Sequence, residues 1–327
     1  MTQLVTIFGG AGFLGRYIAR RMARAGWRVR VVTRSPNEAM FVRTYGAVGQ
    51  VEPVFGNIRD DASVLAALSG ADAVVNCVST FDADGKNSFQ AINIAGAGRI
   101  ARLAAQAGVA RMVQISAIGA DPDSPSEYGR TKAAGESAVL AHMPGALILR
   151  PSIMFGPEDE FFNRFAGMSR FGPILPVIGA DTRFQPVYVD DVAHAVVMGV
   201  MAHGPTGVFE LGGPDVRTFR ELMADMLAVI RRRRLVINLP FGIARLMARG
   251  FRIGAFFTAG LVKGPITRDQ VASLGVDNVV ADGTRGLSDL GITPTAMAAV
   301  LPEYLWRFRP SGQYDAIKES AQKLRKV

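Results

Sequence analysis

Residues 8–15 read FGGAGFLG and follow directly on the apolar run LVTIF at residues 4–8. The glycines match G-x-G-x-x-G at positions 10, 12 and 15, and G-x-x-G-x-x-G at positions 9, 12 and 15. Between a strand and a helix, such glycines permit a tight turn, let the backbone approach a pyrophosphate and let the helix pack closely. The helix N-terminus then offers unpaired N–H groups to the anion. This stretch therefore predicts a dinucleotide-binding strand–loop–helix unit.

Outward from this loop, the first 150 residues alternate apolar runs with helical patterns. Strands are expected at 4–8, 28–33, 51–55, 73–78, 112–116 and 146–150, and helices at 13–25, 61–68, about 86–107 and 128–141. Most of these runs are apolar throughout, which is typical of parallel strands buried on both faces. Their alternation with helices indicates βαβ units. The predicted fold class is therefore α/β, a Rossmann-type doubly wound parallel sheet with a smaller, mostly helical C-terminal domain interleaved with it.

No linker rich in proline, glycine or serine separates the two halves of the chain. We expect a dinucleotide-binding domain at 1–155, to which 184–215 returns with a further strand-and-helix pattern. The smaller domain is expected at 156–183 and 216–327. From Thr218 onward the pattern predicts mostly helix.

The residue that follows the second strand helps to select the dinucleotide. An NAD site typically has an acidic residue there, which bonds the ribose hydroxyls. This chain has VVTRSP instead, with Arg34 and no acid. A guanidinium group pairs with a 2′-phosphate in a bidentate geometry, so the sequence favours NADP(H), with Arg16 as a second positive charge. For each arginine, an ordinary solvated surface role stays open as the alternative. The other expected cofactor contacts are Gly9, Gly12, Phe13, Leu14, Gly15, Asn57, Ile58 and Val78.

A tyrosine and a lysine lie four residues apart in SPSEYGRTKAAGE at 124–136. Tyr128 and Lys132 share one face of the expected helix. A nearby ammonium group should lower the tyrosine pKa from about 10 and so assist proton exchange with a substrate hydroxyl. Ser116, at the end of the fifth strand, would hold the substrate oxygen. The lysine can equally bond the nicotinamide ribose with no chemistry, so these residues are either a catalytic set or cofactor anchors.

Positive charge is concentrated in one part of the chain. Lys and Arg number 37 against 28 Asp and Glu, and the segment from Val216 to Arg268 carries eleven basic and two acidic residues. It includes four consecutive arginines at 231–234, and Arg245, Arg249 and Arg252 share one helical face. The apolar residues of the same stretch are Phe241, Ile243, Leu246, Met247, Ile253, Phe256 and Phe257. This composition favours an interfacial basic amphipathic helix beside an anionic membrane, with a helix packed on its own core as the alternative.

Several classes of protein are disfavoured by composition. The single cysteine, Cys77, excludes a disulfide framework, and the three histidines lack metal-ligand spacing, so no metal is expected. Nucleic acid is not expected as a partner, because no nucleic-acid module is visible and aromatic residues do not alternate with the charges. No apolar run reaches the ~18–20 residues that span a bilayer. A strand candidate at Leu4 instead of a leader favours a bacterial protein without a presequence.

The glycine loop, the YxxxK pattern and RPS…FG together resemble the short-chain dehydrogenase/reductase superfamily, in its extended or atypical branch. RPSIMFGPEDEFFNRF at 150–165, FQPVYVDDVA at 184–193, YGRTKAAGE at 128–136 and ITRDQV at 266–271 are similar to the NADPH-binding accessory subunit family of respiratory complex I. The resemblance runs from Val5 to about Tyr314. It implies a Rossmann-type fold, bound NADPH, a structural or assembly role and no known turnover. The family's cofactor positions correspond to Gly9, Gly12, Gly15, Arg34, Tyr128 and Lys132.

The resemblance also implies a location and partners. These are other complex I subunits near the quinone-binding region and anionic lipid headgroups, with the chain held peripherally at the cytoplasmic face of a bacterial inner membrane. The competing hypothesis is a soluble NADP-dependent reductase, dehydrogenase or epimerase that uses Ser116, Tyr128 and Lys132. The basic segment favours the accessory subunit, and the complete set of three side chains favours the enzyme. Sugar-nucleotide epimerisation is weakened by the missing acid after the second strand.

Overall fold

The structure is a computed structural model of the 327-residue chain, and it describes residues 2–80, 85–244, 246, 267–310 and 312. The chain forms two compact units. Unit 1 comprises Met1–Ser152, Val189–Gly212 and Val279–Pro294, and unit 2 comprises Ile153–Tyr188, Gly213–Asn278 and Thr295–Val327. The division into a dinucleotide-binding domain and a smaller domain, made from the sequence, stays a prediction.

Unit 1 is built on a seven-stranded sheet in the order β11-β6-β5-β4-β1-β2-β3. The strands are β1 (Leu4–Phe8), β2 (Arg28–Thr33), β3 (Val51–Phe55), β4 (Ala73–Asn76), β5 (Arg111–Ile115), β6 (Leu147–Pro151) and β11 (Gly207–Leu211). Every neighbouring pair is parallel. The predicted α/β fold with a doubly wound parallel sheet is thus confirmed.

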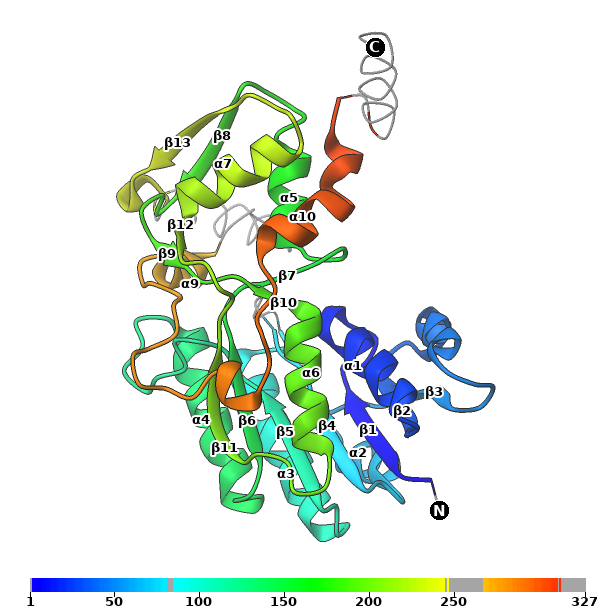
Figure 1. Ribbon diagram of the computed structural model, residues 1–327. Coiled ribbons are helices and arrows are strands. Elements are labelled where there is room, and N and C mark those ends of the chain that lie inside the picture. The colour runs from blue at the N-terminus through cyan, green and yellow to red at the C-terminus, as the bar shows by residue number, and fades with distance from the viewer. Residues whose placement is uncertain (1, 81–84, 245, 247–266, 311, 313–327) are drawn as a thin grey trace, which may run out of the picture. The chain divides into compact units, whose positions relative to one another are not determined.

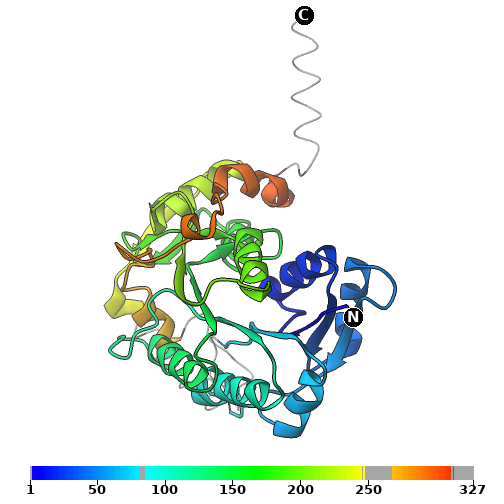
Figure 2. The same ribbon diagram turned by 60° about the horizontal axis from the view of Figure 1, so that its bottom comes forward.

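Helices cover both faces of this sheet (Figures 1 and 2). They are α1 (Phe13–Arg24), α2 (Asp61–Leu68), α3 (Ala97–Gln106), α4 (Glu127–His142) and α6 (Val189–Val200), with shorter helical turns η1 (Pro36–Tyr45), η2 (Gln90–Gly96) and η3 (Ser288–Leu290). In Figure 2, α1 and α6 lie on one face and α3 and α4 on the other. A core of buried apolar side chains lies under α2, α3 and α4, and it includes Phe8, Ile100 and Ile148.

The apolar character of the strands explains why the sequence located them within two residues. All five side chains of β1 and all four of β4 are buried, as parallel strands between two helical layers require. The polar Thr6 is tolerated there because its hydroxyl donates to the carbonyl of Ala67 at 3.0 Å. The helix expected at about 86–107 is divided, because η2 has π-helical geometry before α3 begins.

Unit 2 combines short strand pairs with helices around an aromatic core. Its strands are β7 (Met154–Phe155), β8 (Ile174–Ile178), β9 (Arg183–Phe184), β10 (Val187–Tyr188), β12 (Arg217–Thr218) and β13 (Leu235–Leu239). Its helices are α5 (Phe161–Met168), α7 (Phe219–Val229), α9 (Arg268–Ser273), α10 (Met297–Leu305) and the turn η4 (Trp306–Phe308). Phe155, Phe162 and Phe219 are the largest fully buried side chains in its core.

The expectation of mostly helix after Thr218 is wrong at residues 235–239, which form strand β13. The stretch LVINL at 235–239 pairs in parallel with β8, so that Leu235 lies opposite Ile174 and Leu239 opposite Ile178. Its Val and Ile side chains favour the extended backbone, and the four preceding arginines concealed this strand in a basic stretch.

The predicted basic amphipathic helix is only partly within the described residues. Arg245, Arg249 and Arg252 lie outside them, as do Met247, Ile253, Phe256 and Phe257. Among the helices that the structure describes, none combines the length and apolar character needed to cross a bilayer.

Candidate functional site

The predicted site residues of unit 1 gather at one edge of the parallel sheet. Parallel strands end at a common edge, and Gly9, Arg34, Cys77 and Ser116 each come directly after β1, β2, β4 and β5. The strand order reverses between β1 and β4, because β1 continues to β2 on one side and meets β4 on the other. Ligands of open α/β sheets bind at such a switch point, beyond the carboxyl ends of the strands.

The glycine loop has the close packing that its sequence predicts. Gly9 has a φ of +76°, and a Cβ placed there would lie 3.3 Å from the backbone N of Val78. A Cβ on Gly15 would lie 2.3 Å from the carbonyl oxygen of Gly9, which no side chain permits. The amide of Gly12 donates to that same oxygen at 3.0 Å and closes the turn. The loop therefore requires glycine at positions 9 and 15.

Helix α1 begins directly after this loop. Its N-cap is Gly12, which makes no side-chain capping bond, and Phe13 and Leu14 are its first two residues. The first N–H groups of a helix have no partner within it. Because no side chain caps them, they suit an anion such as a pyrophosphate.

The two predicted phosphate-binding arginines differ in their surroundings. Arg34 is exposed, directly after β2, and makes no ion pair with the part of the chain that the structure describes. The guanidinium group of Arg16 donates to the carbonyls of Gly12 and Ala11 at 3.4 Å each and lies 5.1 Å from the ring centroid of Phe41. Arg34 is thus placed to meet a ligand directly, whereas Arg16 lies on the glycine loop itself.

Three further predicted cofactor contacts, Asn57, Ile58 and Val78, already have contacts within the fold. Asn57 accepts from the backbone and the side chain of Arg59 at 3.2 and 3.3 Å. Ile58 is buried in the core, and its Cδ1 occupies the space that a Cβ on Gly96 would need. Val78 lies against Gly9, beside the glycine loop. Of the three, Val78 is the residue that the fold brings to the loop, and the cofactor roles of all three stay predictions.

The tyrosine and the lysine lie in the first turns of α4. Ser126 caps this helix by accepting from the amide of Gly129 at 3.0 Å. Lys132 is only 4% exposed, and its ammonium group donates to the carbonyl of Ile115 at 2.8 Å and lies 6.0 Å from the ring centroid of Tyr128. The lysine is therefore fixed at the end of β5, one turn along α4 from the tyrosine.

The pKa of the tyrosine is opposite to the one expected from the sequence. Burial raises the pKa of Tyr128 to about 12, although a hydrogen bond with Ser79 acts in the other direction. Burial also lowers the pKa of Lys132 to about 8, although the carboxylate of Glu136 opposes this. The expected lowering of the tyrosine pKa by the lysine is therefore wrong, because burial of the phenol outweighs the hydrogen bond with Ser79.

Ser116, like Lys132, is buried and hydrogen-bonded within the fold. Its hydroxyl donates to the carboxylate of Glu136, and Ser116 is 4% exposed. Arg150 donates to the same carboxylate through Nε at 2.9 Å and through Nη2 at 2.7 Å, and it contacts Glu210 at 3.5 Å. This buried ion pair fixes the serine. Whether Ser116 also meets a substrate stays a prediction.

Two parts of the site were missed in the sequence. Glu136 lies one further turn along α4 from Lys132, and this i, i+4 spacing is a signal that YGRTKAAGE contains. Asn93 in η2 is buried, accepts from Ser79 at 3.2 Å and donates to Thr131 at 3.2 Å. Single turns of π-helix occur often at functional sites. No motif in the sequence revealed this turn.

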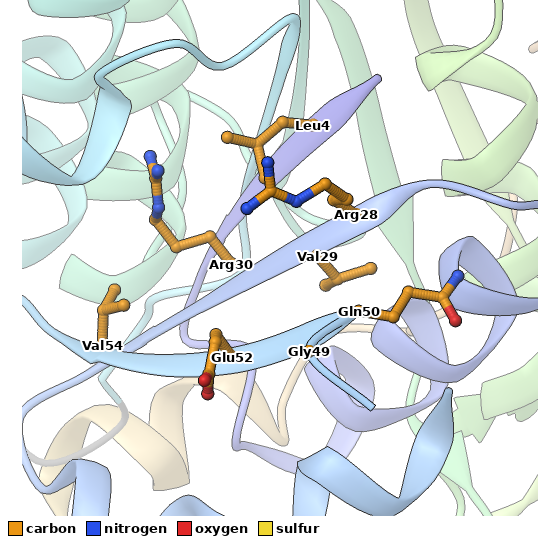
Figure 3. Close-up of a pocket in the computed structure, with 8 residues that line it drawn as sticks. All are labelled: Leu4, Arg28, Val29, Arg30, Gly49, Gln50, Glu52 and Val54. Carbon is orange, nitrogen blue, oxygen red and sulfur yellow. The ribbon is translucent and has the colours of Figure 1, made fainter. Parts of the chain in front are cut away.

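A separate hollow of about 180 Å³ lies on unit 1 near the amino end of β1 and along β2 and β3 (Figure 3). Three of its four polar side chains already have partners within the fold, and the fourth, Arg28, is exposed. Arg30 donates to the carbonyl of Ala67 at 2.6 Å, Glu52 pairs with Arg43 at 2.8 Å, and Gln50 donates to the carbonyl of Ala23. The hollow is therefore a poor candidate for a ligand site. No cluster of three metal-ligating side chains occurs among the described residues.

Comparison with known proteins shows which family the sequence matches. Residues 5–212 match the family described as NAD dependent epimerase/dehydratase. The chain is 35% identical to the mitochondrial NADH dehydrogenase [ubiquinone] 1 alpha subcomplex subunit 9 of Arabidopsis thaliana, over 94% of this chain and 79% of the relative. It is 33% identical to the ceramide reductase of Caulobacter vibrioides, over 72% of this chain and 74% of the relative. Its fold is similar to that of UDP-glucose 4-epimerase of Thermus thermophilus in complex with NAD, with a TM-score of 0.68, 19% identity and coverage of 94% and 100%.

Proposed function

The chain belongs to the NAD dependent epimerase/dehydratase family, and from that premise we propose that it is an accessory subunit of respiratory complex I that holds a nicotinamide dinucleotide. The 35% identity to a complex I subunit over nearly the whole chain supports the assembly. The glycine loop, whose close contacts exclude any side chain, supports the nucleotide. The dinucleotide stabilises the folded subunit because it binds the native state and not the unfolded chain.

One observation above all favours an accessory role over an enzymatic one. The hydroxyl of Ser116, which an active site would direct at a substrate oxygen, donates to the buried carboxylate of Glu136. Lys132 donates to the carbonyl of Ile115, and Tyr128 has a raised pKa. A bound nicotinamide ring supplies hydride chemistry only when a substrate oxygen is held and protonated beside it. The residues present suit nucleotide retention better than proton transfer near neutral pH.

We assign NADPH as the nucleotide, because Arg34 stands where an NAD site has an acid. The first turn of α1, with Phe13 and Leu14, receives the pyrophosphate, and Lys132 and Tyr128 hold the nicotinamide ribose. Arg16 adds positive charge at the glycine loop.

We further propose a bacterial member of this family, bound peripherally at the cytoplasmic face of the inner membrane. Its partners are complex I subunits near the quinone-binding region and anionic lipid headgroups, and nucleic acid is not among them. The eleven basic residues between Val216 and Arg268 support an anionic neighbour.

The test of the assembly is isolation of the tagged chain from its native membranes in mild detergent, with mass spectrometry of the proteins that copurify. We expect the core subunits of complex I in stoichiometric amounts, and their retention after a high-salt wash. Recovery of the chain alone, with complex I intact in the unbound fraction, would contradict the proposal.

A second function is favoured by one observation. Tyr128 and Lys132 are both present, and the Caulobacter relative at 33% identity is named as a reductase. If this chain is such an enzyme, the purified protein should oxidise NADPH in the presence of a lipid ketone, and Tyr128→Phe should abolish that activity while nucleotide binding persists.

A further inference from the structure

An exposed group of apolar and basic side chains lies along the β8–β13 pair of unit 2. The arginine–apolar patch, as we name it, consists of Arg170, Phe171, Ile174 and residues 231–235. Phe171 is 91% exposed, Leu235 64% and Ile174 49%, and Leu235 pairs directly with Ile174 across the two strands. Isolated apolar side chains are ordinary on a protein surface, but three in one place beside arginines mark an interaction surface.

Two arginines of the patch, Arg232 and Arg234, are held near each other by backbone carbonyls. The Nε of Arg232 donates to the carbonyl of Phe308 at 2.9 Å, and that of Arg234 to the carbonyl of Ser169 at 2.7 Å. Burial, then the charges of Arg234 and Arg170, lower the pKa of Arg232. Carbonyl partners orient these guanidinium groups but do not neutralise their charge. The fold thus maintains a concentrated positive charge that an anion would stabilise.

We propose that the arginine–apolar patch binds the surface of an anionic phospholipid bilayer. The arginines meet the headgroup phosphates, while Phe171, Ile174 and Leu235 enter the boundary between headgroups and acyl chains. A bilayer accounts for both halves of the patch, because it offers negative charge and an apolar layer within a few ångströms of each other. A nucleic acid would match the arginines but not the two aliphatic side chains, which provide no stacking surface.

This inference deepens the proposed membrane location, but it depends on unit 2 alone. It makes no use of the nucleotide site or of any complex I subunit. Vesicle binding by the purified chain therefore tests it separately. Copurification with complex I can succeed when vesicle binding fails, and the reverse is equally possible.

The experiment is cosedimentation of the full-length purified chain with vesicles of phosphatidylcholine, with and without phosphatidylglycerol. We expect binding only to the anionic vesicles, weakened by salt. The double variant Arg170→Glu/Arg233→Glu should bind at least about 30-fold more weakly, since each basic residue contributes about 1 kcal/mol at an anionic surface and 1.4 kcal/mol is tenfold. The matched control is Arg24→Glu/Arg28→Glu, which reverses two exposed arginines of unit 1 and should leave binding unchanged.

The apolar half of the patch has its own pair of variants. Phe171→Ser/Leu235→Ser should weaken binding while its salt dependence persists, whereas Val48→Ser/Leu65→Ser, at exposed apolar positions of unit 1, should not. Both patch variants are checked for unchanged thermal unfolding. Equal binding by patch and control variants, equal binding to neutral vesicles, or patch-dependent binding to RNA or an acidic peptide in place of vesicles would overturn the proposal.

Discussion

In the proposed function, Arg34 and Lys132 would hold the two ends of the nucleotide in different ways. Arg34 is exposed and meets the ligand from solvent, so its contribution is the charge that it directs at a 2′-phosphate. Lys132 is buried between β5 and α4, where it is also near the thiol of Cys77, whose pKa burial raises to about 12. We therefore expect Arg34 to select the nucleotide and Lys132 to link nucleotide binding to the stability of the fold.

Replacing Arg34 with alanine should reduce the preference for NADP(H) over NAD(H). Loss of a charge-assisted bond costs about 1.5–3 kcal/mol, so we expect a roughly 10- to 150-fold weaker affinity for NADPH and little change for NADH. Calorimetric titration of both nucleotides measures this. Arg24→Ala, at an exposed arginine near the end of α1, is the control. An equal loss for the two nucleotides would remove the assignment of Arg34.

The pKa of Lys132 predicts how stability depends on pH. Its folded-state pKa of about 8 lies below the unfolded value of 10.5, so between these values the unfolded chain binds more protons. The contribution of Lys132 to the free energy of unfolding should therefore rise with pH between about 8 and 10.5. The measurement is urea unfolding of the nucleotide-free protein and of Lys132→Met from pH 7 to 10.5. Subtracting the variant removes the titration of Tyr128, and making the comparison in a Cys77→Ala background removes that of the neighbouring thiol. A difference that is flat or falls with pH would contradict the buried, desolvated lysine.

At the scale of elements, the sequence predicted what depends on local pattern. β1 through β6 and the glycine loop were found because most of these strands are apolar runs and because the spacing of the glycines is a local pattern. β13 was missed, since its extended backbone depends on pairing with β8, about 60 residues earlier in the chain. The bond from Ser116 to Glu136 was missed for the same reason: it joins β5 to α4 through packing that no local spacing displays.

A substitution in the glycine loop tests whether the nucleotide binds there. Gly15→Ala would place a methyl group 2.3 Å from the carbonyl oxygen of Gly9, so α1 must move away from the loop. Overpacking of this kind typically costs 1–3 kcal/mol, and we expect both that loss of stability and a loss of nucleotide binding. Gly145→Ala is the matched control, because nothing lies within 4 Å of its added Cβ. Fluorescence titration with NADPH and chemical unfolding report the two effects, and an unchanged affinity in Gly15→Ala would show that the nucleotide does not use this loop.

At the scale of the whole molecule, the residues proposed for nucleotide binding and those proposed for membrane attachment lie in different units. The predicted nucleotide residues all lie in unit 1, and the arginine–apolar patch lies in unit 2. Variants of the patch should therefore leave NADPH affinity intact, and variants of the glycine loop should leave vesicle binding intact wherever the chain remains folded. A net reductase oxidises its NADPH at each turnover, whereas an accessory subunit stabilised by its ligand keeps that ligand unchanged.

The most direct test of this account is the amount and redox state of nucleotide bound to the chain within isolated complex I. The complex is taken through many turnovers with NADH and a quinone, and the nucleotide is then released by acid-free denaturation and identified. The account predicts a single NADPH per chain, still reduced, and its loss from complexes that carry Lys132→Met. Absence of nucleotide, or its conversion to NADP⁺ in step with quinone reduction, would contradict it.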